Sequence, residues 1–78
     1  MRRLLIKYTL PLDGDVSDFD NIIASIVSAH GGTKTIESGF YFSTRTRDIG
    51  ALVPDGTLDD CLADLAKNGF VTEIQAAA

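Results

Sequence analysis

The chain has 78 residues, of which 45% are hydrophobic, and its formal net charge is −4. This length predicts one domain over residues 1–78, which buries about 60–65% of the surface of the unfolded chain. The composition lies outside the range of disordered chains, no stretch is long enough to span a membrane, and the negative charge argues against strong nonspecific binding to nucleic acid.

The cysteine content indicates a reducing compartment. A single cysteine cannot form an internal disulfide, and Cys61 falls on the apolar stripe of a predicted helix. We therefore interpret Cys61 as a small buried hydrophobic residue and expect a cytoplasmic location.

The first predicted element is a half-buried strand over Arg3 to Leu10, in which apolar and polar side chains alternate. A turn over residues 11–14 follows, and Asp15 or Ser17 is placed to cap a helix. One continuous apolar stripe on that helix comprises Phe19, Ile22, Ile23, Ile26, Val27 and His30. The pair Gly31–Gly32 ends the helix.

Two strands are predicted next. Thr33 to Ser38 contains few large apolar side chains, which is typical of a strand at the edge of a sheet. Ser38–Gly39 is predicted to form the turn that joins this strand to the next one in a hairpin. The aromatic and β-branched run Phe40 to Thr46 is then predicted as the central strand. Phe40 and Phe42 are expected in the core, because the opposite choice would bury a charge and polar groups.

Residues 47–56 show no clear period, and we expect an ordered loop that covers part of the core. Thr57 is predicted to cap a second helix that Gly69 ends, and Phe70 to Gln75 alternates as a final strand. The element order predicts an α+β, ferredoxin-like βαββαβ fold with a four-stranded antiparallel sheet, central first and third strands, and two helices on one face.

Catalytic constellations are mostly missing from the sequence. One histidine, one cysteine and the lack of a glycine-rich phosphate loop exclude the common triads, Cys/His zinc sites and P-loops. His30 is expected in the last helical turn, where the helix dipole favours it. Asp13 and Asp15 flank Gly14, where a cation could bind, but a turn followed by a helix cap explains them as well. We expect no metal and no cofactor.

Two short motifs resemble those of the RNA-recognition motif. Residues 38–42 are similar to its third-strand signature and residues 5–11 to its first. The resemblance implies that Phe40 and Phe42 stack on bases. The sequence departs from that pattern at Ile6, Ser38 and Tyr41, where the family has an aromatic, a basic and a small residue.

A second resemblance covers most of the chain. The strand over residues 6–10, the helix that ends in Gly31–Gly32 and the Glu37–Ser38 hairpin into an aromatic strand resemble a small ferredoxin-like group. This group contains the CRISPR adaptation nuclease subunit and the VapD and SinR-like proteins. The resemblance implies dimerisation through sheets. Its nucleases keep an aspartate after the first-strand tyrosine, where this chain has Thr9, and this departure argues against nuclease activity.

Two surfaces are predicted to carry the function. The open sheet face and its basic end comprise Arg3, Lys7, Tyr41, Ser43, Arg45 and Arg47. Arg3 and Arg45 are expected to approach each other there, as an anion patch or as partners of Asp48, Asp55 or Glu73. The acidic surface comprises Asp13, Asp15, Asp18, Asp20, Asp59, Asp60 and Asp64.

These features predict a non-enzymatic, acidic protein-binding module that forms a homodimer. An acidic module of this size also suits a phage-type inhibitor of the anti-CRISPR kind, which masks a nucleic-acid-binding surface of a partner protein. The alternatives are a VapD-like metal-dependent ribonuclease that uses Asp13 or Asp15, and an RNA binder like the RNA-recognition motif.

Overall fold

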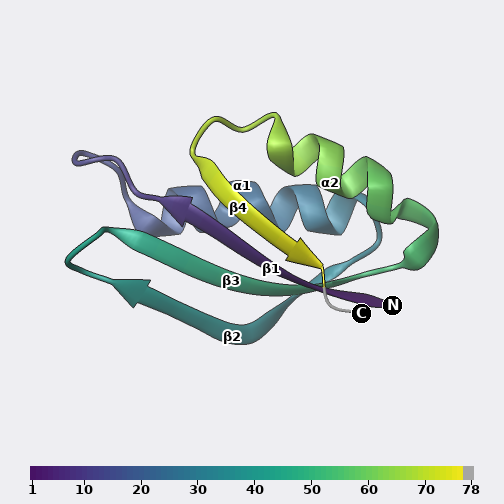
Figure 1. The fold of residues 1–78 in the computed structure, drawn as a ribbon. Coiled ribbons are helices and arrows are strands. Elements are labelled where there is room, and N and C mark those ends of the chain that lie inside the picture. Colours follow the sequence, from purple (N-terminus) through teal and green to yellow (C-terminus); the bar gives the residue numbers. More distant parts are fainter. Residues whose placement is uncertain (77–78) are drawn as a thin grey trace.

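The computed structural model describes residues 1–76, except for the side chains of residues 36–38. Within this part of the chain, four strands and two α-helices follow one another, with a short 3₁₀ helix before the second α-helix (Figure 1). Their bounds are β1 Arg2–Thr9, α1 Val16–Ala29, β2 Thr33–Tyr41, β3 Thr46–Val53, η1 Asp55–Thr57, α2 Leu58–Ala66 and β4 Val71–Ala76.

The strands described above form one antiparallel sheet in the order β2-β3-β1-β4. The strands β1 and β3 therefore lie in the centre, and β2 and β4 form the edges. Both α-helices lie on the same side of this sheet, and the other side is not covered by a helix (Figure 1). The predicted α+β class, with two helices and an antiparallel sheet, is confirmed.

The core lies between the two helices and the sheet. The alternation predicted for β1 is confirmed, because Leu4, Ile6 and Tyr8 are all fully buried. The side chains of the core that are almost inaccessible to solvent are Leu4, Ile6, Tyr8, Leu10, Ile23, Val27, Ile49, Ala51, Val53, Cys61 and Leu65. Burial of these apolar surfaces is the main contribution to the stability of so small a domain.

The predicted position of the central strand is wrong. The run Phe40 to Thr46 contains the end of β2 and the turn that leads into β3, and the central strand is the segment that was expected to be a loop. In β3, the buried side chains of Ile49, Ala51 and Val53 alternate with residues on the other face. This period-two pattern fits a central strand, although glycine and alanine make it weak in the sequence.

The residues expected to turn the hairpin are in fact paired within it. Ser38 and Gly39 lie opposite Ile49 and Asp48, and the register of β2 against β3 shifts between Lys34 and Ser38. The chain reverses after Tyr41 instead, over residues 42–45. Arg45 has a φ of +54°, a left-handed conformation that a non-glycine residue rarely adopts.

The helix α1 has the predicted boundaries and nearly the predicted stripe. Asp15 is its N-cap, since its Oδ1 accepts a hydrogen bond from the backbone N–H of Ser17 at 2.9 Å. Ile23 and Val27 are fully buried, whereas Ile22 is 40% exposed and lies outside the core. Gly32 follows the helix, and a Cβ there would lie 2.5 Å from the carbonyl oxygen of Leu52, so the close approach to β3 requires glycine.

The start of α2 differs from the prediction in one detail. Thr57 precedes the helix, but its side chain makes no cap hydrogen bond. Its Oγ1 donates instead to the carbonyl oxygen of His30 at 2.7 Å. Thr57 therefore ties the beginning of α2 to the end of α1.

Candidate functional site

The residues predicted to form one binding surface are distributed over three places. Arg3, Lys7 and Tyr41 belong to the face that the helices do not cover, Ser43 and Arg45 lie in the turn 42–45, and Arg47 lies on the helix side. Arg3 pairs with Leu52 at the far end of the sheet from the turn, so the predicted approach of Arg3 and Arg45 is wrong. The two arginines were expected to meet because the central strand was predicted at residues 40–46. The actual strand β3 begins at Thr46, so residues 45–47 have a different register and face from those predicted.

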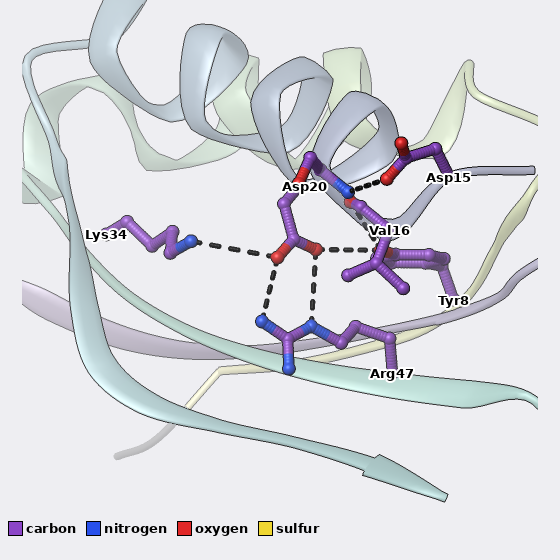
Figure 2. Close-up of polar contacts among 7 residues, drawn as sticks. Tyr8, Asp15, Val16, Asp20, Lys34 and Arg47 are labelled. Carbon is purple, nitrogen blue, oxygen red and sulfur yellow. Dashed lines mark hydrogen bonds and ion pairs between the residues drawn. The ribbon is translucent and has the colours of Figure 1, made fainter. Parts of the chain in front are cut away.

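Arg47 instead belongs to a buried polar network under α1 (Figure 2). Its Nη2 lies 2.7 Å from Asp20 Oδ2 and its Nε donates to Asp20 Oδ1 at 3.3 Å, so the guanidinium binds the carboxylate with two nitrogens. The hydroxyl of Tyr8 donates to Asp20 Oδ1 at 2.7 Å, and Lys34 Nζ lies 3.8 Å from Asp20 Oδ2. Asp20 is only 7% exposed, so its predicted place on the acidic surface is wrong.

The pKa values in this network follow from burial and hydrogen bonding. Burial alone would raise the pKa of Asp20, but the hydrogen bonds from Arg47 and Tyr8 outweigh it and hold that pKa below its ordinary value of 3.8. Burial, assisted by the hydrogen bond to Asp20, raises the pKa of Tyr8 above its ordinary value of 10.0. The hydrogen bond to Asp20 also raises the pKa of Arg47 above its ordinary value.

The contacts of this network indicate a structural role. Side chains of Tyr8, Lys34 and Arg47 all approach the two carboxylate oxygens of Asp20, which thereby joins α1 to β1, β2 and β3. An aspartate held in this way stays ionised and is not free to act as a general base or a metal ligand. The network therefore fixes the position of α1 on the sheet.

The open sheet face is the side of the sheet away from the helices, with Leu5 and Lys7 from β1, Asp48 and Leu52 from β3 and Glu73 from β4. Lys7 Nζ lies 3.3 Å from Glu73 Oε2. Asp48 Oδ1 is buried and has no hydrogen-bond partner among the residues that the structure describes. Leu5 and Leu52 are half-buried. The face is therefore a mixture of charged and apolar groups.

Three of the exposed apolar side chains lie at one end of the molecule, whereas Met1, which is 69% exposed, lies at the N-terminus at the other end (Figure 1). Phe42 is 85% exposed, Leu12 is 89% exposed and Tyr41 is 57% exposed. The turn that carries Phe42 and the loop that carries Leu12 both project at the left end of Figure 1. We call the surface formed by Leu12, Tyr41 and Phe42 the aromatic end. The prediction that Phe42 lies in the core is wrong, whereas Phe40 is partly buried and packs against the core.

Arg45 holds the two segments of the aromatic end together. Its guanidinium donates from Nε to the carbonyl oxygen of Leu10 at 3.2 Å and from Nη2 to that of Pro11 at 2.7 Å and that of Leu12 at 3.4 Å. The backbone N–H of Leu10 in turn donates to the carbonyl oxygen of Arg45 at 2.8 Å. The loop after β1 is thereby fixed against the hairpin turn.

The ring of Phe42 is oriented by its neighbour. Phe40 and Phe42 make an edge-to-face contact with ring centroids 5.0 Å apart and an interplanar angle of 86°. Such contacts contribute about 0.5–1.5 kcal/mol beyond area burial. The exposed ring is therefore held in a defined position by a partly buried neighbour that packs against the core.

The remaining predicted acidic residues have different surroundings. Those that are exposed as predicted are Asp13, Asp15, Asp18, Asp59 and Asp60. Asp64 is partly exposed, and its Oδ2 lies 2.7 Å from His30 Nε2 while its Oδ1 lies 3.3 Å from Lys67 Nζ. Among the described residues, no three His, Cys, Asp or Glu side chains are grouped so that they could hold a metal ion. Asp15 Oδ1 serves as the helix cap instead.

The contact between His30 and Asp64 is not predicted by the sequence, in which the two residues are 34 positions apart and only the dipole of its own helix favours His30. The contact joins the C-terminal end of α1 to α2. The hydrogen bond from His30 lowers the pKa of Asp64, and Lys67 lowers it further. Cys61 is fully buried, and burial raises the pKa of its thiol, which agrees with its interpretation as a hydrophobic residue.

No protein-family model matches the sequence, and no curated protein matches it either. Within the residues that the structure describes, no helix is both long enough and apolar enough to cross a membrane.

Proposed function

We propose that the chain is a non-enzymatic module with ferredoxin-like topology that binds a partner protein through its aromatic end. The topology is supported by the element order β1, α1, β2, β3, α2, β4 and by the strand order β2-β3-β1-β4. An inhibitor of the phage type, which masks a nucleic-acid-binding surface of its partner, is one form that this function takes.

The observation that carries the proposal is that Phe42 is exposed on a hairpin turn whose position is fixed by Arg45. Burial of aromatic side chains stabilises a small domain, yet Phe42 is 85% exposed, whereas the rings of Phe19 and Phe70 pack against buried Tyr8 at the core. Arg45 fixes the backbone on which the exposed ring is carried. Rigid aromatic side chains dominate binding energies at protein interfaces, because little conformational entropy is lost when they bind.

The open sheet face supports a second part of the proposal, which is self-association into a homodimer. Leu5 and Leu52 supply half-buried apolar surface on this face, beside the ion pair of Lys7 and Glu73. A second copy that packed against this face would bury that apolar surface further. Light scattering of the purified chain should then give twice the monomer mass, and Leu52→Ser should shift the equilibrium toward the monomer.

The test of protein binding is affinity capture with the full chain, followed by mass spectrometry and compared with a Phe42→Ser variant. The wild-type chain should retain a protein that the Phe42→Ser variant loses. Ile22→Ser is the matched control, because Ile22 is an exposed apolar residue on α1 rather than at the aromatic end. Equal recovery by the wild-type chain and Phe42→Ser, or recovery of nucleic acid alone, would exclude the proposal.

A further inference from the structure

The aromatic end is bordered by negative charge. Asp13 directly follows the exposed Leu12, Asp15 caps α1, and Asp18 lies in the first turn of that helix. All three are exposed. The turn 42–45 adds one basic residue, Arg45, whose guanidinium is already bound to the carbonyl oxygens of residues 10–12. An apolar centre with an acidic border thus faces outward at this end.

This combination disfavours two classes of partner. Proteins that stack bases on exposed aromatic rings place those rings in a positively charged groove, whereas here the loop after β1 and the start of α1 add three exposed carboxylates, which repel phosphate, to this end of the molecule. Anionic membrane surfaces attract basic segments and repel acidic ones. Nucleic acid and lipid are therefore poor occupants of the aromatic end.

A second copy of the chain is also a poor occupant. Two aromatic ends that faced each other would bring their acidic borders together. Four of the seven basic residues already form ion pairs with carboxylates of their own chain, namely Lys7, Lys34, Arg47 and Lys67, so much of the positive charge of a second copy is already neutralised. Self-association through the aromatic end would thus be opposed by electrostatic repulsion.

We infer that the partner is a protein with an apolar pocket that receives Phe42 and a basic rim that meets Asp13, Asp15 and Asp18. This inference rests on the proposed function and specifies the chemistry of the partner at the same site. The apolar contact supplies most of the affinity, because a buried aromatic side chain at the centre of an interface acts as a hot spot. The charges at the border accelerate association and discriminate between partners.

The test begins with a photo-crosslinking analogue, p-benzoylphenylalanine, in place of Phe42 in the full chain, which is expressed in the organism that encodes it. The crosslinked residue of the partner is mapped by mass spectrometry, and the partner is then purified. The mapped residue should lie in an apolar pocket with lysine or arginine side chains around it. Phe42→Ser should weaken the Kd for the purified partner about 30-fold or more.

The acidic border is tested with matched triple variants. Asp13→Asn, Asp15→Asn and Asp18→Asn together remove the border charge, and asparagine at position 15 retains the helix cap. This variant should weaken binding about tenfold at low salt and much less at high salt. Asp55→Asn, Asp59→Asn and Asp60→Asn remove the same charge from the exposed start of α2 and should change the Kd less than about twofold.

The outcomes separate the inference from the proposed function. If Phe42→Ser abolishes binding but the two triple variants behave alike, or if the mapped pocket has no basic rim, the inference is wrong and the protein-binding function stands. If residue 42 crosslinks to a second copy or to nucleic acid, or does not crosslink at all, both are wrong. Circular dichroism of each variant should show that the fold is retained.

Discussion

The substitution Asp20→Asn tests whether the buried network holds α1 on the sheet. The aspartate carboxylate accepts hydrogen bonds from Tyr8 and from two nitrogens of Arg47. Asparagine has nearly the same shape, but it carries no charge and replaces one acceptor by an NH₂ donor. In this variant, the Arg47 guanidinium keeps its charge in a largely buried position and loses its counter-ion.

The expected cost is large for a domain of this size. Removal of one partner from a buried ion pair costs about 3–5 kcal/mol, and the remaining acceptor of asparagine places the cost near the lower end, at about 3 kcal/mol. A domain of 78 residues has a free energy of unfolding of about 4–12 kcal/mol. The variant should therefore lose between a quarter and most of its stability.

The assay is urea denaturation followed by circular dichroism at neutral pH. Asp18→Asn, on the exposed face of the same helix, is the control and should cost no more than about 1 kcal/mol. Arg47→Met should destabilise the wild-type chain but stabilise the Asp20→Asn variant, because it removes the unpaired charge. A loss of less than about 1 kcal/mol in Asp20→Asn, with an unchanged m-value, would refute the reasoning.

The pH dependence of the free energy of unfolding provides a second measurement of the same effect. The pKa of Asp20 is lowered on folding from its ordinary value of 3.8. Its contribution to stability is therefore present above that pH and is lost as the pH falls through the folded-state pKa. The stability difference between the wild-type chain and Asp20→Asn should accordingly narrow in acid. A constant difference across this range would show that the charge of Asp20 is not the cause.

Three further predictions follow from the same structure. Phe42→Ala should change the free energy of unfolding by about 1 kcal/mol or less in a urea titration, and Phe40→Ala should cost more, because Phe40 packs against the core. Arg45→Ala should be about 1 kcal/mol less stable than Arg45→Gly in the same assay, since only glycine adopts a φ of +54° without strain; equal stability would contradict that backbone conformation. Asp64→Asn should lower the thermal midpoint at neutral pH, and the difference should vanish in acid because the pKa of Asp64 is lowered from 3.8 on folding; a difference that persists in acid would assign the effect to packing.

The elements that the sequence predicted well are those with strong local signals. The first strand has a clear alternation, α1 has a cap at Asp15 and a glycine pair at its end, and α2 has an apolar stripe that includes Cys61 and Leu65. Each of these signals lies within a window of about 18 residues, so the periodicity and the capping rules suffice.

The central strand was misplaced because two signals compete there. The aromatic run from Phe40 has a higher strand propensity than β3, in which Gly50 and Ala51 weaken the alternation. The true turn has no glycine or asparagine and depends on Arg45, whose left-handed backbone is stabilised by contacts with a loop more than 30 residues away. A contact between residues so far apart in the chain cannot be predicted from the local sequence.

The buried network could have been detected in part. Asp20 lies on the same helical stripe as Val16, Ile23 and Val27, at spacings of four, three and four residues. A charged residue on a buried stripe requires a partner, but the register that brings Arg47 opposite Tyr8 exists only in the folded sheet. The acid was therefore interpreted as part of a solvated helix face.

The two arginines on either side of Thr46 connect the core to the aromatic end. Arg47 is bound inside the domain by Asp20, and Arg45, two residues earlier, binds the loop that carries Leu12. The short segment between them is paired with β1, so the position of the hairpin turn is fixed from both sides. A change that releases Arg47 should also loosen the support of Phe42. The affinity for the partner should consequently fall in the Asp20→Asn variant, although Asp20 is buried and cannot itself contact a partner. The exposed ring of Phe42 is therefore an extension of a rigid core.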